Sequence, residues 1–370
     1  ILMINILYYR PKIYWVILNI LMIFLMISIG GITRLTDSGL SMTEWSLIGG
    51  ILPPTSHLEW INTFAKYKLS PEFIYKNYDM TLVEFKKIFF WEYFHRIWGR
   101  LIGLTFFLPL IYFWITKKFS NFEKLFFSGL LFLGSMQAFM GWFMVESGLI
   151  KNPDVSHFRL SAHLIIAFVI YSLMLFFLWT NLALARRNFS IWNNNPFKII
   201  DKKPNKLNIF LLIFSISVLL ITIMSGAFVA GTKAGWAYNN FPLMGDNILP
   251  PILINPDHSG FNGLLNDLGF IQFFHRVLAS TTLLLLILVA VYFIKKGATS
   301  LINGLSKFLL VSISAQYVLG ILILKYYVPI SLGIIHQLGS LIVISILIVM
   351  LSEEICLGAK NSSLKQIKID

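Results

Sequence analysis

The chain has 370 residues, of which 57% are hydrophobic and only 13% are charged, and its formal net charge is +13. Soluble domains carry about 25% charged residues, so this composition excludes an ordinary soluble protein. The excess of lysine and arginine would suit a nucleic-acid partner, but these residues lie between apolar runs rather than in one basic patch. We therefore expect a membrane protein that binds no nucleic acid.

Apolar runs of 18 or more residues recur along the chain, and such runs predict membrane-spanning helices. Eight spans are expected, at about residues 13–30, 88–115, 123–145, 158–181, 207–230, 270–294, 304–325 and 331–351. The first run is followed by no small-residue cleavage site and preceded by no transit peptide. We therefore expect a retained first span and a location in the bacterial inner membrane.

Lysine and arginine are concentrated before the first span, after the last span and in every second connection between spans. The positive-inside rule places such segments in the cytoplasm. The connections on the other side include two long ones, residues 31–87 and residues 231–269. This charge bias predicts a multi-pass protein with both termini in the cytoplasm.

The two long connections follow the first and the fifth spans, which suggests that a unit of four spans occurs twice. Short motifs recur in matching order: Thr36-Asp37-Ser38-Gly39 with Thr232-Lys233-Ala234-Gly235, Phe94-His95-Arg96 with Phe274-His275-Arg276, and Ser135, Gln137 and Gly141 with Ser314, Gln316 and Gly320. We predict an all-α integral membrane protein whose halves, residues 1–200 and 201–370, form two tandem four-helix bundles. Because four is an even number, a pseudo-twofold axis should run along the membrane normal.

Four histidines lie in the apolar spans: His95, His163, His275 and His336. Counted at 1.5 Å per residue, all four imidazoles should lie roughly 8–11 Å below the outer membrane boundary. An ionisable side chain at such a depth is a functional candidate by default. The alternative is a neutral histidine that only forms a hydrogen bond between helices.

Two imidazoles between the helices of a bundle suit the two axial positions of a haem iron. Zinc or copper would usually need more ligands, and the single cysteine, Cys356, excludes a site with two thiolates. The simplest interpretation is one haem in each half. His95 would pair with His163, and His275 would pair with His336.

The two halves differ beside their first histidines. Glu92 lies three residues before His95, on the same helix face, whereas Gln272 occupies the matching position before His275. This difference suggests that one haem reacts and the other only carries electrons. Glu92 could instead be an interfacial carboxylate paired with an arginine, either Arg96 or Arg159.

The arginines that follow these histidines, Arg96 and Arg276, have two interpretations. A guanidinium group suits carboxylates, so each arginine could bind the propionates of a haem. Extension of the side chain to the membrane surface would explain them equally well.

These residues resemble the haem A synthase family over nearly the whole chain. The resemblance rests on the eight spans, the repeat, Glu-x-x-His-Arg in the second span and one histidine in each of the fourth, sixth and eighth spans. It also includes residues 30–42 and residues 239–244. Within the family, the chain looks most like the proteobacterial and mitochondrial members.

The resemblance implies that the protein oxidises the C8 methyl of haem O to a formyl group through a hydroxymethyl intermediate, haem I, for cytochrome oxidase biogenesis. His95 and His163 would flank haem O in the N-terminal half, where Glu92 would be the catalytic carboxylate. His275 and His336 would ligate a haem B cofactor in the C-terminal half. Haem O synthase would supply the substrate, and an unidentified electron donor or acceptor is implied; whether the chain forms a homo-oligomer is left open.

Two other classes of protein fit part of the pattern. A bis-histidine b-type electron-transfer cytochrome would also hold two haems. Such cytochromes often place two histidines on one helix, so that haems stack across the bilayer, whereas here each histidine has its own helix. A transporter that uses the histidines as a proton relay would need no haem.

Overall fold

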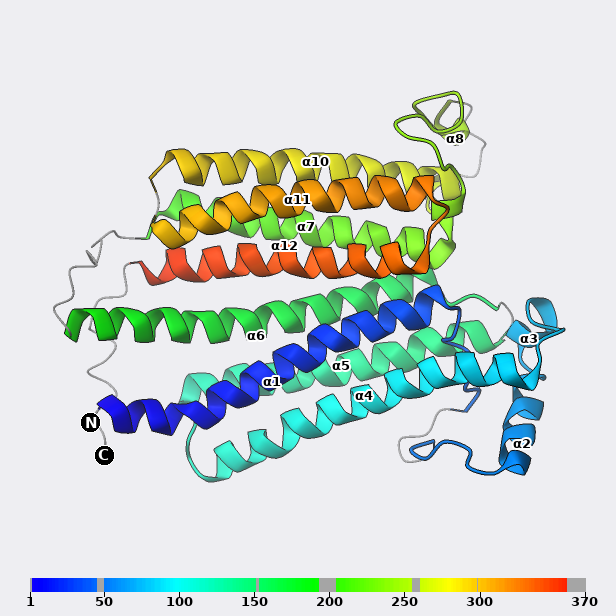
Figure 1. Cartoon of the computed structure of the whole chain (residues 1–370), viewed down its shortest axis with the longest axis horizontal. Helices are drawn as coiled ribbons and strands as arrows, with labels where there is room; N and C mark the ends of the chain where they lie inside the picture. The colour runs from blue at the N-terminus through cyan, green and yellow to red at the C-terminus, as the bar shows by residue number, and fades with distance from the viewer. Residues whose placement is uncertain are drawn as a thin grey trace.

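The computed structural model describes residues 2–44, 50–150, 153–192, 204–254, 260–297 and 299–357. Within these ranges, eight helices are long and apolar enough to cross a membrane. They run side by side along the longest axis of the molecule (Figure 1). The prediction of an all-α membrane protein with eight spans is therefore confirmed.

Each predicted span lies within one of the long helices, and the helices extend beyond the spans. Their bounds are α1 Leu2–Leu35, α4 Leu82–Ile115, α5 Asn121–Ile150, α6 His157–Trp192, α7 Lys206–Thr232, α10 Leu268–Lys295, α11 Ser300–Lys325 and α12 Ile330–Cys356. The short elements are α2 His57–Tyr67, α3 Pro71–Tyr75, η1 Ala234–Trp236, α8 Pro251–Ile254 and α9 Gly260–Leu264.

A capping box explains why α4 begins at Leu82 rather than near residue 88. The Thr81 side chain accepts a hydrogen bond from the Glu84 backbone N–H, and the Glu84 side chain accepts one from the Thr81 N–H. These two bonds satisfy N–H groups that the start of a helix leaves free. The helix therefore starts in a polar segment that hydropathy alone assigns to the loop.

The long helices pack in the same order in both halves. In the first half, α1 contacts α4 and α6, and α5 lies between α4 and α6; in the second half, α7 contacts α10 and α12, and α11 lies between α10 and α12. The halves meet through α1, α6, α7 and α12. The pseudo-twofold axis stays a prediction, and the predicted division at residue 200 lies outside the described residues.

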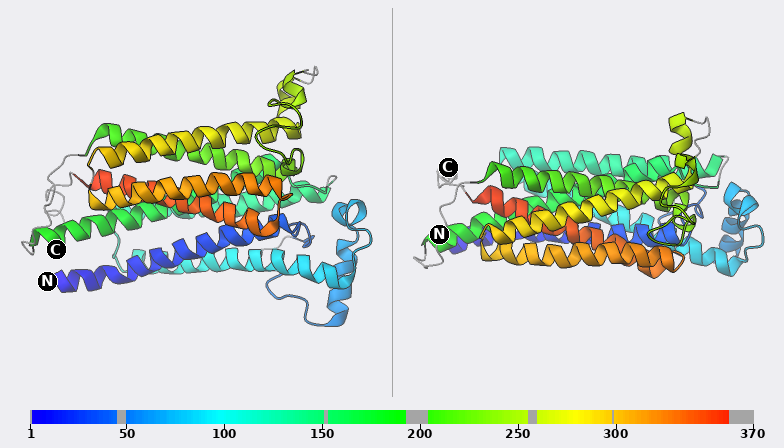
Figure 2. Two further views of the ribbon diagram at one scale, coloured as in Figure 1. Left: turned by 45° about the horizontal axis from the view of Figure 1, so that its top comes forward. Right: turned by 90° about the horizontal axis from the view of Figure 1, so that it is seen from above.

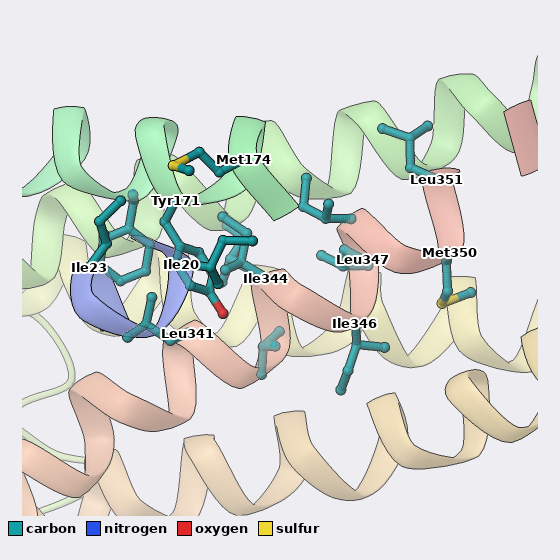
Figure 3. Close-up of a cluster of buried hydrophobic side chains, with 14 of the residues drawn as sticks. Ile20, Ile23, Tyr171, Met174, Leu341, Ile344, Ile346, Leu347, Met350 and Leu351 are labelled. Carbon is teal, nitrogen blue, oxygen red and sulfur yellow. The ribbon is translucent and has the colours of Figure 1, made fainter. Parts of the chain in front are cut away.

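The largest buried cluster runs through both halves and includes the place where they meet. Figure 3 shows side chains of α1, α6 and α12 interlocking there, and the buried residues include Ile20, Ile23, Tyr171, Met174, Leu341, Ile344, Leu347 and Met350. A helix that is apolar on all sides is expected to be buried among its neighbours. The helix α12 is of this kind, and it joins the two bundles into one core.

A smaller apolar cluster lies outside the bundles. It consists of Met42, Phe64, Tyr67, Phe85 and Phe89, and it packs α2 against the start of α4. The elements α2, α3 and α8 all lie at one end of the molecule, and α1 begins and α12 ends at the opposite end (Figures 1 and 2). This arrangement requires an even number of spans, but which end faces the cytoplasm stays a prediction.

Candidate functional site

The four histidines come from helices that lie diagonally across each bundle. His95 belongs to α4 and His163 to α6, while His275 belongs to α10 and His336 to α12. The imidazoles of His95 and His163 are close enough to interact electrostatically, and so are those of His275 and His336. The structure therefore brings together the two pairs that the sequence suggested.

Each imidazole of the first pair packs against a glycine of a neighbouring helix. A Cβ atom added to Gly30 of α1 would lie 3.4 Å from Nε2 of His95, and one added to Gly141 of α5 would lie 3.1 Å from Cε1 of His163. The contact at Gly141 would be tighter than ordinary van der Waals packing, and the contact at Gly30 would lie at its lower limit. The missing side chains therefore leave space for the imidazoles in the interior of the bundle.

The second pair also packs against glycines, here with Cε1 of both rings nearest to the glycine. A Cβ atom at Gly226 of α7 would lie 3.1 Å from Cε1 of His275, and one at Gly320 of α11 would lie 3.2 Å from Cε1 of His336. The match between Gly320 and Gly141 is visible in the sequence, but the contact of each residue with a histidine is visible only in the structure. Two of the helices in each bundle thus provide a histidine, and the other two provide a glycine.

The glutamines at matching positions of the two bundles have different partners. The amide nitrogen of Gln137 lies 3.2 Å from Nε2 of His163. The amide of Gln316 instead donates to the backbone carbonyl of His336, at 2.8 Å. A Cβ atom on Gly339 would lie only 2.0 Å from the amide oxygen of Gln316. Because glycine has no Cβ atom, Gln316 can take this position and donate to the His336 carbonyl.

The donor set fits a haem better than a bare metal ion. Within the described residues, no three side chains of His, Cys, Asp or Glu come together in a way that could hold a metal ion. Tetrahedral zinc sites need three or four protein ligands, whereas haem iron takes its axial ligands from two sides. Among the described residues, Nδ1 of His163 and Nδ1 of His336 are also buried without a hydrogen-bond partner.

Glu92 is buried at the start of the N-terminal bundle and holds the loop that follows α1. Its Oε1 atom lies 2.5 Å from a guanidinium nitrogen of Arg96. Its Oε2 atom accepts hydrogen bonds from the Ser41 hydroxyl at 2.7 Å and the Met42 N–H at 2.8 Å. The sequence left open whether Glu92 pairs with Arg96 or with Arg159, and the structure shows the pair with Arg96. Arg159 instead donates to the Phe143 carbonyl, at 2.6 Å.

Gln272 holds the matching loop of the C-terminal bundle. Its amide nitrogen donates to the Tyr238 carbonyl at 3.0 Å, and its amide oxygen accepts from Arg276 at 3.1 Å. Arg276 also donates to the carbonyl of Asn240, as Arg96 does to that of Met42, each at 3.0 Å. Both arginines are thus fixed by loop carbonyls, and their binding of propionates stays a prediction.

Glu72 is a buried carboxylate in the outer loop that no motif of the sequence indicates. The Tyr67 hydroxyl donates to its Oε2 atom at 2.9 Å, and Tyr67 itself is fully buried. Burial raises the pKa of Glu72 to about 7; the Tyr67 hydrogen bond and Lys76 oppose this shift, and the charges of Glu92 and Asp37 reinforce it. The outer loop therefore places a second carboxyl group near Glu92.

The fold and the site together define a polytopic helical membrane protein with a pair of histidines in each of two four-helix bundles. A model of the cytochrome oxidase assembly protein family matches residues 13–348. The chain therefore belongs to this family, and the resemblance drawn from its motifs is confirmed.

Relatives named heme A synthase are similar to the chain over nearly its full length. The protein of Nitrosospira multiformis is 39% identical over 339 residues, which cover 90% of each chain. The protein of Rickettsia felis is 41% identical over 335 residues, which cover 90% of this chain and 95% of the relative. The protein of Flavobacterium psychrophilum is 39% identical over 346 residues, which cover 91% of this chain and 96% of the relative.

Proposed function

We propose that the protein is an oxidoreductase that converts haem O to haem A for cytochrome oxidase biogenesis. It would oxidise the C8 methyl of haem O to a formyl group through the hydroxymethyl compound haem I. The observation that carries this proposal is the pair of similar bundles, each with a histidine on two diagonal helices. Within the described residues, Glu92 provides a buried carboxylate beside the first histidine of one bundle, and Gln272 takes that position in the other. The names of the similar proteins support the same function.

In this proposal, the N-terminal bundle binds the substrate. His95 and His163 hold haem O, and Gly30 and Gly141 leave room for their imidazoles. Glu92 accepts or donates a proton near the reacting methyl group, since a positioned carboxylate can do so. Its contacts with Ser41 and Met42 keep the outer loop closed over this end of the bundle and limit the entry of water.

The C-terminal bundle holds a resident haem B between His275 and His336. Haem supplies the one-electron redox chemistry that this site needs. Gln272 offers no ionisable group at the position of Glu92, which suits a site that carries electrons without reacting. Arg96 and Arg276 are proposed to support the propionates in addition to holding their loops.

The setting of the reaction is also part of the proposal. The distribution of lysine and arginine supports an inner-membrane protein with both termini in the cytoplasm. A haem O synthase would supply the substrate, and a separate redox partner would accept or donate electrons.

The proposal is tested by haem extraction and chromatography. The chain is expressed together with a haem O synthase in a host that makes no haem A. We expect haem A or haem I to appear only when the intact chain is present. Haem B with unconsumed haem O would instead favour an electron-transfer cytochrome, and the absence of bound haem would favour the transporter.

A further inference from the structure

A buried hydroxyl group contacts one of the four histidines directly. Ser225 of α7 is only 5% exposed, and its Oγ atom lies 2.8 Å from Nδ1 of His275. The same oxygen donates a hydrogen bond to the Thr222 carbonyl at 2.7 Å. A serine hydroxyl has one proton to donate, so this carbonyl uses the only proton of Ser225.

The direction of the contact with His275 follows from this assignment. Because a carbonyl can only accept, the Ser225 proton points to Thr222, and the Ser225 oxygen accepts the hydrogen bond from Nδ1 of His275. The Thr222 carbonyl is a second acceptor for the same imidazole. The other ring nitrogen, Nε2, then keeps its lone pair. The hydrogen bond that one ring nitrogen of a histidine donates determines that the other ring nitrogen is free to bind a metal.

The N-terminal bundle has no hydroxyl at the matching place. Gly226 and Gly30 occupy equivalent positions beside His275 and His95, and the residue before each of them is Ser225 in one half and Ile29 in the other. A side chain of isoleucine cannot accept a proton from an imidazole. The two first histidines of the bundles therefore differ in what holds their rings.

The difference extends along the contact between neighbouring helices. In the C-terminal half, the hydroxyls of Thr222 on α7 and Thr282 on α10 lie 2.6 Å apart and are buried. The matching residues of the N-terminal half are Met26 and Ile102. At this level, hydroxyl groups join α7 to α10. The helices α1 and α4 are joined at other levels, where Trp98 donates to the Met22 carbonyl and Thr33 donates to the Trp91 carbonyl.

We infer that Ser225 is a positioning residue that fixes the tautomer and ring orientation of His275, and that it makes the C-terminal bundle the permanent haem site. This inference rests on the proposed function, in which one haem stays and the other leaves as product. The N-terminal bundle, with Ile29 in the same place, holds its histidine less firmly and releases its haem. The Ser225 hydrogen bond also makes the imidazole a stronger electron donor to a bound iron.

The test uses the purified full-length protein with its bound haem B, in the wild type and in Ser225→Ala, Ser225→Thr and Thr282→Val variants. Two quantities are measured: the reduction potential of haem B and its rate of transfer to an excess of apomyoglobin. We expect Ser225→Ala to raise the potential, because a poorer electron donor stabilises ferric iron less, and to speed haem loss by about 10-fold or more. Ser225→Thr, which keeps the hydroxyl, should restore both values.

Thr282→Val is the matched control, because it removes a hydroxyl from the same helix contact without touching His275. It should leave the potential of haem B unchanged. An equal shift in Thr282→Val and Ser225→Ala would assign Ser225 a merely structural role and overturn the inference. Unchanged potential and haem loss in Ser225→Ala would overturn it as well.

A wild-type protein without haem B would overturn the proposed function together with this inference. A wild-type protein that contains haem B, with variants that behave alike, would overturn only the inference.

Discussion

Asp37 and Lys233 occupy the same position in the two halves of the chain, and they form an ion pair with each other. Oδ2 of Asp37 lies 2.8 Å from Nζ of Lys233. Both residues follow the ends of equivalent helices and have left-handed backbones, with φ values of 49° and 58°, which is uncommon for residues other than glycine. Equivalent helix ends thus meet at the junction of the halves, and opposite charges join them.

Removal of Asp37 should weaken this junction more than removal of Lys233. Asp37 also binds Arg34, whose guanidinium lies 2.9 Å from its Oδ1 atom, so Lys233→Met leaves Asp37 with one partner. Exposed ion pairs contribute about 0.2–1 kcal/mol. We expect Asp37→Asn to lower the Tm of the detergent-solubilised protein by a few degrees and Lys233→Met by less; equal values would contradict the shared role of Asp37.

Replacement of Glu92 by glutamine should spare haem binding but lower the yield of haem A. An amide cannot exchange a proton as a carboxylate does, and loss of general acid–base catalysis costs about 100-fold or more. Haem chromatography measures the yield. Ser41→Ala is the matched control, because it removes one of the bonds between Glu92 and the loop, at 2.7 Å, but keeps the carboxylate. An equal loss in both variants would limit Glu92 to holding the loop.

The glycines that face the histidines predict separate effects in the two bundles. Gly141→Ala would place a Cβ atom 3.1 Å from His163, and Gly320→Ala would place one 3.2 Å from His336. We expect the first variant to lose haem A formation while it keeps haem B, and the second to lose haem B. Gly103→Ala is the control, since nothing lies within 4 Å of its added Cβ atom; a similar loss in this variant would contradict the role of the glycines.

The buried carboxyl of Glu72 should make the outer loop less stable as the pH rises. Its pKa of about 7 lies above the ordinary value of 4.5. Its contribution to stability is therefore complete below pH 4.5 and is lost as the pH rises through about 7. Since each pKa unit corresponds to about 1.4 kcal/mol, the loss should be on the order of a few kcal/mol.

Limited trypsin digestion of the loop at about pH 5.5 and about pH 8 measures this effect. After correction for the pH dependence of trypsin on a peptide substrate, cleavage after Lys68 should be faster at the higher pH in the wild type. Glu72→Gln should remove the difference, because the amide does not ionise and can still accept the bond from Tyr67. The same pH dependence in both proteins would rule out Glu72 as its source.

The membrane-spanning part of the fold could be predicted from the sequence because hydropathy reports directly on burial in lipid. The eight spans, their division by two long loops and the even count all follow from it. The ends of the helices could not be predicted in this way. The start of α4 depends on the hydrogen bonds between Thr81 and Glu84, and the ends of α1 and α7 depend on single residues in a left-handed conformation.

The histidines and Glu92 could be identified because charged or ionisable groups are rare in apolar spans. The residues that lie beside these groups were harder to predict from the sequence. Ser225 is one of several hydroxyl residues in a long apolar helix, and Glu72 is one acidic residue in a polar loop; only packing shows that each is buried beside a functional group. The histidine-facing glycines had a signal in the sequence, since Gly30 and Gly226 match, as do Gly141 and Gly320.

The central claim is that the two pairs of histidines hold two haems with different fates. The most direct measurement is the haem composition of purified protein in which one pair at a time is replaced by alanine. Loss of His275 and His336 should remove haem B and leave haem O bound, whereas loss of His95 and His163 should keep haem B and abolish binding and conversion of haem O. If either double variant loses both haems alike, or if haem B disappears with His95 and His163, the two bundles do not divide the work as proposed.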